Sequence, residues 1–151
     1  MQRNLYFLND KSIYGGILTK YGRVPGVYIL KCVDKDNKYI SIPRLLNNDD
    51  NGTLYIGSSG DVVKRVGSLA KSIFAAVGVE NYKDFSSHPL GHKYKNKNII
   101  KKFPYCGLCV EVMPLKTAHE KEATLLKEYE DAFGEAPPFN EGRPKAKHLS
   151  G

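Results

Sequence analysis

Thr53-Leu-Tyr-Ile-Gly-Ser-Ser-Gly-Asp-Val-Val-Lys-Arg65 is the stretch of sequence that decides the fold. Its first five residues are rich in β-formers and follow Asn51-Gly52, a pair typical of hairpin turns, so residues 53–57 predict a strand. Asp61 is a favourable N-cap, and the residues after it predict a helix. The apolar side chains that share one face of that helix are Val62, Val63, Val66, Leu69 and Ala70.

The residues before this stretch predict its partner strand. Gly26 to Val33 (GVYILKCV) is a compact β-rich run. The polar stretch 34–52 separates it from the strand at 53–57. We therefore expect a hairpin whose connection is long or carries an insertion.

The residues after the stretch predict one more strand and one long helix. Residues 105–113 predict the strand, whereas residues 80–102 are polar and basic and give no clear pattern. Thr117 to Phe133 predicts a helix that ends at Gly134, because Pro137-Pro138 cannot continue it. We expect an α/β (α+β) fold with a small three-stranded, mainly antiparallel sheet flanked by helices.

The length and composition suit one globular domain. The chain has 151 residues, of which 41% are hydrophobic and 26% charged. We expect an irregular N-terminal arm over residues 1–25, a folded domain over 26–142 and a basic tail over 143–151. No run approaches the ~20 apolar residues of a membrane helix, and no signal peptide is apparent. We therefore expect a cytoplasmic protein without membrane contact.

The three cysteines do not indicate a disulfide framework, because their number is odd and no signal sequence precedes them. Cys106 and Cys109 form a CxxC pair, which suggests zinc. On a strand, however, residues i and i+3 point to opposite faces, and no second pair completes four ligands. Small buried thiols, Cys32 included, are the favoured interpretation.

The net charge is strongly positive. The chain has 23 Lys and Arg against 16 Asp and Glu, which gives +7 at pH 7. Such a balance suits a polyanionic partner, and nucleic acid is the first candidate. It also serves solubility, so charge alone does not decide between the two.

One carboxylate falls on the apolar face of the helix at 117–133. The apolar residues of that face are Ala118, Leu125, Leu126, Tyr129 and Phe133, and Glu122 lies among them, whereas Glu120 points away. Glu120 has a structural explanation, because it forms a capping-box pattern with Thr117. A charge at Glu122 is costly unless it is paired or binds a metal. Glu122 is thus functional, or paired with an arginine, or on a locally exposed face, and the pattern favours none of these.

Five elements in order resemble the GIY-YIG nuclease family. The two halves of its signature are matched by Gly26-Val27-Tyr28, with Val in place of Ile, and by Tyr55-Ile56-Gly57. Arg65 follows Tyr55 by ten residues, as the family's arginine does. The closing motifs are similar to Glu122 with Leu125-Leu126 and to Pro138 with Asn140. The resemblance runs from Gly26 to Asn140 and includes the glutamate that the helix pattern singled out.

The resemblance implies that the protein hydrolyses DNA phosphodiester bonds with a divalent metal ion, Mg²⁺ or Mn²⁺. Glu122 would be the single protein ligand of the metal, and Arg65 would hold the scissile phosphate. Tyr28 would be the general base or position the water, Tyr55 would hydrogen-bond the phosphate or nucleophile beside it, and Asn140 would support the site. Taken singly, the tyrosines are typical of a core edge and Arg65 of a solvated surface.

The chain departs from the family pattern in two places. Leu69 stands where members often carry a His or Tyr one turn after the arginine, so another group assists the base or none is needed. His88 and His92 are the candidates for an auxiliary base, although histidines in a polar loop are more often surface residues. Tyr28 and Tyr55 are also 27 positions apart, which is wider than usual. The insertion at 34–52 adds a DNA-contacting loop or nothing functional.

Basic residues are placed where a nuclease would contact DNA phosphates. They flank Arg65 on its helix, cluster between residues 93 and 102 with Tyr94 interleaved, and follow Asn140. A solvated charged surface is the alternative. The expected DNA-binding residues are Lys64, Lys71, Lys93, Lys95, Lys97, Lys101, Lys102 and Arg143.

The sequence therefore predicts a metal-dependent DNA endonuclease of restriction, phage or mobile-element, or repair type. One active site per chain favours a homodimer, or sequential nicks, for double-strand cleavage. The alternatives are a catalytically inactive DNA-binding module with the same fold and an unrelated basic RNA-binding protein. Metal dependence separates these classes, because binding alone survives chelation.

Overall fold

The computed structural model describes residues 5–10, 12–82 and 88–140, and a four-stranded antiparallel sheet forms its centre. The strand order is β1-β6-β2-β5. The mixed α/β class and the three expected strands are confirmed, and one strand is added that the sequence did not predict. The strands are β1 (Leu5–Phe7), β2 (Gly26–Cys32), β5 (Thr53–Ser59) and β6 (Leu108–Pro114).

The described part of the N-terminal segment is regular and belongs to the core. β1 pairs with β6, and α1 (Ile13–Tyr21) follows it and buries Ile13 and Ile17. The expectation of an irregular arm is therefore wrong for residues 5–10 and 12–21. The helix was missed because Gly15-Gly16 lowers its intrinsic propensity, which the packing of its apolar face overcomes.

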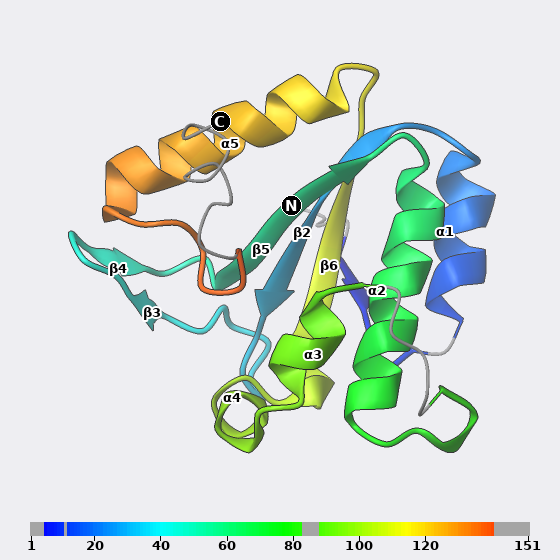
Figure 1. Cartoon of the computed structure of the whole chain (residues 1–151), viewed down its shortest axis with the longest axis horizontal. Coiled ribbons are helices and arrows are strands. Elements are labelled where there is room, and N and C mark those ends of the chain that lie inside the picture. Colours follow the sequence, from blue (N-terminus) through cyan, green and yellow to red (C-terminus); the bar gives the residue numbers. More distant parts are fainter. Residues whose placement is uncertain (1–4, 11, 83–87, 141–151) are drawn as a thin grey trace, which may run out of the picture.

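Helices cover both faces of the sheet (Figure 1). α1 and α2 (Val62–Ala76) lie on one face, and α5 (Ala118–Phe133) lies on the other. Side chains along β2 alternate between the two faces of the sheet and so contribute to the core on each face. Tyr28 belongs to the main core beneath α2, whereas Val27 packs with Ile56 and Ala118 beneath α5.

The signals that end and begin the helices are partly as predicted. Asp61 caps α2, and its side chain accepts a hydrogen bond from the backbone N–H of Lys64 at 3.2 Å. Gly134 ends α5 in the left-handed conformation, with φ 82°. The expected capping box is not formed, because the side chain of Thr117 makes no capping hydrogen bond.

The segment expected as a strand over 105–113 begins with a 3₁₀ turn, Tyr105–Gly107, and continues as β6. The turn exposes Cys106, so the prediction of a buried thiol is wrong there. Cys32 and Cys109 are buried as predicted, and all three thiols are free.

The insertion at 34–52 forms a small hairpin docked on the end of α5. Its strands are β3 (Ile42–Pro43) and β4 (Asn48–Asp49). Asp49 is fully buried and accepts a hydrogen bond from the Tyr129 hydroxyl at 2.7 Å. Arg44 pairs with Glu135 at 3.1 Å. These contacts fix the insertion in place and leave Leu45 and Leu46 exposed between its strands.

The polar, basic region folds into short elements that pack beside α2. They are the 3₁₀ turn Glu80–Tyr82, α3 (Leu90–Tyr94) and α4 (Lys97–Lys102). Tyr94 is buried, and its hydroxyl donates to the carbonyl oxygen of Phe103. Within residues 5–10, 12–82 and 88–140, no helix is both long and apolar enough to cross a bilayer.

Candidate active site

Three aromatic rings meet at the β5 edge of the sheet. Tyr28 of β2 lies opposite Gly57 of β5, which brings its ring to within 5.9 Å of the Tyr55 ring, centroid to centroid. The His88 ring centroid lies 6.1 Å from that of Tyr28 and 5.5 Å from that of Tyr55. Tyr28 is 1% exposed, whereas Tyr55 is half-buried. Tyr55 is therefore the tyrosine of the pair that reaches the surface.

His88 is fully buried, although the sequence placed it in a polar surface loop. Its Nδ1 accepts the backbone N–H of Leu90 at 3.2 Å, and its Nε2 lies 2.9 Å from Tyr28 Oη. Because Nδ1 accepts, the neutral ring carries its proton on Nε2 and donates it to Tyr28 Oη. The Tyr28 hydroxyl proton is then available to another acceptor. His92, the other candidate histidine, is exposed on α3.

The environment keeps these three rings neutral at pH 7. Burial, assisted by the charge of Arg65, lowers the pKa of His88 to about 3. Burial raises the pKa of Tyr28 above its usual range, against the opposing charge of Arg65. Burial also raises the pKa of Tyr55, the charge of Glu122 adds to this effect, and a hydrogen bond with Tyr28 and the charge of Arg65 oppose it.

These properties change the role expected of His88. A base of pKa about 3 without exposed surface cannot take a proton from a substrate at neutral pH. In this structure His88 is a buried hydrogen-bond donor that holds Tyr28, a position that favours a positioning role, and its role as auxiliary base stays a prediction. Its backbone N–H donates to Ser72 Oγ at 3.0 Å, which ties it to α2.

Acid is expected to destabilise the protein through His88. Between pH 6.5, the ordinary pKa, and about 3, the pKa in the fold, the unfolded chain binds one more proton than the folded chain. The free energy of unfolding therefore falls as the pH decreases, by about 2 kcal/mol at pH 5 from this group. Urea unfolding measures the free energy of unfolding at pH 7.5 and at pH 5. The difference between these two values should be smaller for His88→Gln than for wild type. His92→Gln should keep the wild-type difference, and an equal difference in all three proteins contradicts this account.

Asn140 holds the backbone of β5 in place, and Gly57 leaves room for the two tyrosine rings. The Asn140 amide pairs with the free edge of β5: Oδ1 accepts the Ile56 N–H and Nδ2 donates to the Ile56 carbonyl, both at 3.0 Å. A side chain at Gly57 would place its Cβ 2.7 Å from Tyr28 Oη and 2.8 Å from the Tyr55 ring. Glycine is needed here for space.

Glu122 approaches the same edge from α5. Ser58 Oγ donates to Glu122 Oε1 at 2.5 Å, and His119 Nδ1 lies 3.7 Å from the same oxygen. The Glu122 side chain is 23% exposed, which agrees with the alternative of a locally exposed face that the sequence left open. The stripe is itself only half-buried at Leu125 and Leu126, because α5 covers the edge strand and not the sheet centre.

Arg65 completes the group from the first turns of α2. It is half-buried, and its positive charge lowers the pKa values of His88, Tyr28 and Tyr55. It therefore lies near all three rings and is not a solvated surface residue. The structure thus brings together the five residues that the sequence selected, Tyr28, Tyr55, Arg65, Glu122 and Asn140, around β5.

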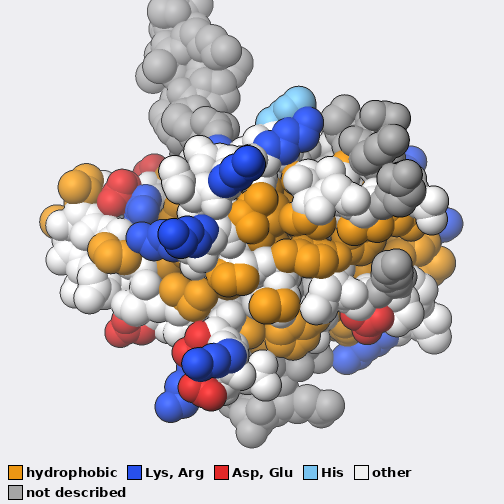
Figure 2. Space-filling model, turned by 90° about the horizontal axis from the view of Figure 1, so that it is seen from below, with side chains coloured by type: hydrophobic (Ala, Val, Ile, Leu, Met, Phe, Trp, Pro, Cys, Tyr) orange, Lys and Arg blue, Asp and Glu red, His pale blue; other side chains and the backbone are white. Residues whose placement is uncertain are grey.

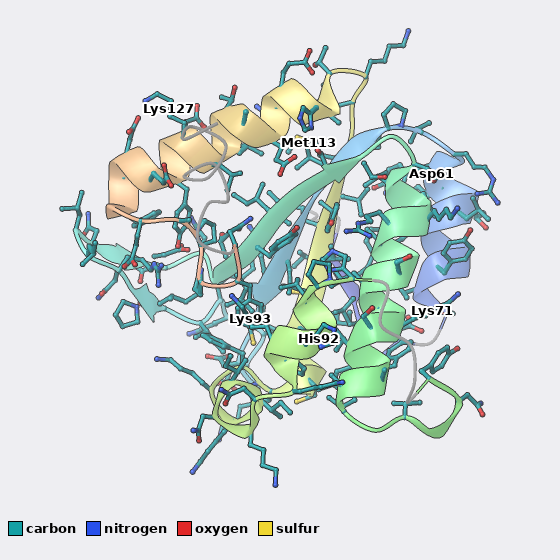
Figure 3. The ribbon with its side chains drawn as sticks, in the orientation of Figure 1. Asp61, Lys71, His92, Lys93, Met113 and Lys127 are labelled. Carbon is teal, nitrogen blue, oxygen red and sulfur yellow. The ribbon has the colours of Figure 1, made fainter. Side chains whose placement is uncertain are left out.

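The expected DNA-binding lysines lie in two places. Lys95, Lys97, Lys101 and Lys102 are exposed on or beside α4, and Figure 2 shows Lys and Arg side chains gathered beside a hydrophobic band on the face seen from below. Lys93 lies on the side of α3 nearer to β2 and β5, whereas Lys71 lies on the far side of α2 (Figure 3). Lys64 is exposed on the first turn of α2, and Arg143 lies outside the described residues.

The chemistry of this group suits a phosphate ester. Arg65 offers a planar cation for phosphate oxygens, and Glu122 offers a partly exposed carboxylate to a hard cation. Among the described residues, no three His, Cys, Asp or Glu side chains gather as a metal site. A cation at Glu122 would complete its coordination with water and substrate oxygens, as Mg²⁺ commonly does. Comparisons with protein-family models, curated proteins and solved structures give no match.

Proposed function

We propose that the protein is a divalent-metal-dependent DNA endonuclease that hydrolyses phosphodiester bonds at the β5 edge, in the manner of the GIY-YIG nucleases. One observation carries the proposal. Side chains from β2, β5, α2 and α5 meet there. The ring centroids of Tyr28 and Tyr55 are 5.9 Å apart, and Glu122 accepts a hydrogen bond from Ser58 of β5. Arg65 is half-buried on α2, and its charge lowers the pKa values of both tyrosines. A cation, a carboxylate and a surface hydroxyl group at one edge are what phosphodiester hydrolysis requires.

Glu122, through a bound cation, and Arg65 stabilise the negative charge of the substrate phosphate. Glu122 would hold Mg²⁺ or Mn²⁺, which would supply Lewis-acid stabilisation of the charge that develops on the phosphoryl oxygens. Ser58 holds the carboxylate in one orientation, so little reorganisation is needed on binding. Arg65 binds the scissile phosphate, because a guanidinium donates two parallel hydrogen bonds to its oxygens.

The exposures of the tyrosines favour an exchange of their expected roles. Tyr28 is too buried to meet a water molecule, whereas Tyr55 reaches the surface. Hydrogen bonds run from Leu90 N–H to His88 and from His88 Nε2–H to Tyr28. We infer that the Tyr28 hydroxyl donates in turn to Tyr55, whose ring centroid lies 5.9 Å from that of Tyr28. Such a chain stabilises negative charge on the last oxygen. Tyr55, once ionised, accepts the proton of the attacking water, and Tyr28 is its positioning residue.

The basic surface on α3 and α4 holds the rest of the DNA. This region begins directly after His88, so its lysines follow the site along the chain. We propose that they bind backbone phosphates without reading sequence. Cleavage of both strands then requires a homodimer or two successive nicks, because the described residues of each chain form one such site.

Removal of the metal tests the proposal. The full chain should relax and then linearise supercoiled plasmid in Mg²⁺ or Mn²⁺. EDTA should stop cleavage, excess Mg²⁺ should restore it, and mobility-shift binding should persist throughout. Tight DNA binding without cleavage of duplex, branched or single-stranded DNA in either metal would replace the proposal with an inactive DNA-binding module. Cleavage of RNA alone would change the substrate class.

A further inference from the structure

His119 is an exposed residue on the same side of α5 as Glu122, one helical turn before it. Its Nδ1 lies 3.7 Å from Glu122 Oε1, and its side chain is 93% exposed. Packing therefore does not fix the ring, which can turn toward the carboxylate at little cost. Neither the apolar pattern of the helix nor the motifs of the sequence single this residue out.

The spacing of the pair suits two ligands of one cation. Residues i and i+3 are neighbours on a helix surface. Glutamate and histidine at this separation bind metal together in helical carboxylate sites, with the glutamate first, whereas here the histidine comes first. Adjacent ligands of an octahedral ion at about 2.1 Å are about 3 Å apart. The observed 3.7 Å between Nδ1 and Oε1 needs only a small rotation of the exposed ring.

Open space adjoins His119 on two sides, and Glu122 borders one of the two hollows. One hollow of about 300 Å³ is lined by His119, Glu122, Ala123 and Leu126, among others. A second hollow of about 200 Å³ is lined by His119 and Ser58, among others. His119 is common to both hollows, so a cation between His119 and Glu122 has room for water and for phosphate oxygens.

We propose that His119 is a second protein ligand of the divalent cation that Glu122 binds, an inference that rests on the proposed function. A ring nitrogen is a better ligand for Mn²⁺ and Co²⁺ than for Mg²⁺, which prefers oxygen. His119 therefore sets the metal preference of the site: it strengthens the binding of Mn²⁺ and contributes little to that of Mg²⁺.

The test is the binding of Mn²⁺ to the full chain without DNA, followed by the loss of the electron paramagnetic resonance signal of the free ion. His119→Ala should weaken Mn²⁺ binding about tenfold, and Glu122→Ala should abolish it. Mg²⁺ affinity, measured by competition with Mn²⁺, should change less than about twofold in His119→Ala. His92→Ala removes another exposed histidine and is the matched control, which should bind as wild type does.

The outcomes separate this inference from the proposed nuclease function. Three results would overturn the proposal that His119 is a ligand. They are unchanged Mn²⁺ binding in His119→Ala, an equal loss of binding in His92→Ala, and no Mn²⁺ binding by wild type. Mn²⁺ binding that needs both His119 and Glu122, without cleavage of any nucleic acid, would support His119 as a ligand and contradict the proposed nuclease function. In the third outcome cleavage needs Glu122, but His119→Ala keeps the wild-type ratio of the rates in Mn²⁺ and Mg²⁺. This result would support the nuclease function and contradict His119 as a ligand.

Discussion

Glu122→Gln is expected to lose about three orders of magnitude in cleavage rate, whereas Glu120→Gln keeps the wild-type rate to within about twofold. Glutamine has nearly the same shape, and its side-chain carbonyl can still accept the hydrogen bond that Ser58 donates to Oε1. The substitution removes the charge that holds the cation and leaves the packing of α5 in place. The measurement is single-turnover nicking of supercoiled plasmid at saturating Mg²⁺.

Glu120 is the matched control for this result. It lies two residues earlier on the same helix, is exposed, and carries the same charge. A general loss of negative charge from α5 would affect both variants equally. Equal cleavage by Glu122→Gln and wild type would place the metal on another residue, and equal loss in both variants would attribute the effect to the helix and not to a ligand.

Tyr55→Phe is expected to reduce the cleavage rate by about 10² to 10⁴, the usual contribution of a group that transfers a proton. The raised pKa of Tyr55 predicts a wild-type rate that increases with pH, because ionisation supplies the acceptor. The variant should lose this increase. Tyr28→Phe should lose only about tenfold and move the increase to higher pH, since the donor that stabilises the Tyr55 oxygen is removed.

The pair of tyrosine variants decides which hydroxyl group meets the water. Rates are compared from pH 6 to about 10 under single-turnover conditions, at a temperature where thermal unfolding shows each variant folded. A larger loss in Tyr28→Phe than in Tyr55→Phe would restore the roles that the family resemblance implied. It would also mean that Tyr28, 1% exposed in this structure, becomes accessible when DNA binds.

Local signals in the sequence account for the elements that carry the site. The run GVYILKC and the turn at Asn51-Gly52 predicted β2 and its pairing with β5, and Asp61 predicted the start of α2. These signals depend on neighbours within a few residues, so they can be recognised from the sequence without knowledge of the tertiary structure. The motif order then selected the tyrosines, Arg65 and Glu122, which the structure gathers at one edge.

Signals of tertiary origin were missed or misread. β1 is only three residues long, and its place beside β6 depends on pairing across about a hundred positions. Thr117 and Glu120 match a capping box in sequence, but Thr117 makes no capping hydrogen bond. The sequence did not decide whether Glu122 is buried, and the structure leaves it partly exposed because a helix over an edge strand leaves part of its inner face open to water.

The sequence by itself determined the strands and helices around the site and the identity of its charged groups, because periodicity, caps and motif order are local properties of a chain. Only the tertiary structure decided the surroundings of His88. This residue bonds to Tyr28 across 60 positions and to Ser72 across 16, and α3, which follows it, is too short to show a pattern. Burial, tautomer and pKa are set by what packs against a side chain, and residues distant in the sequence supply that packing.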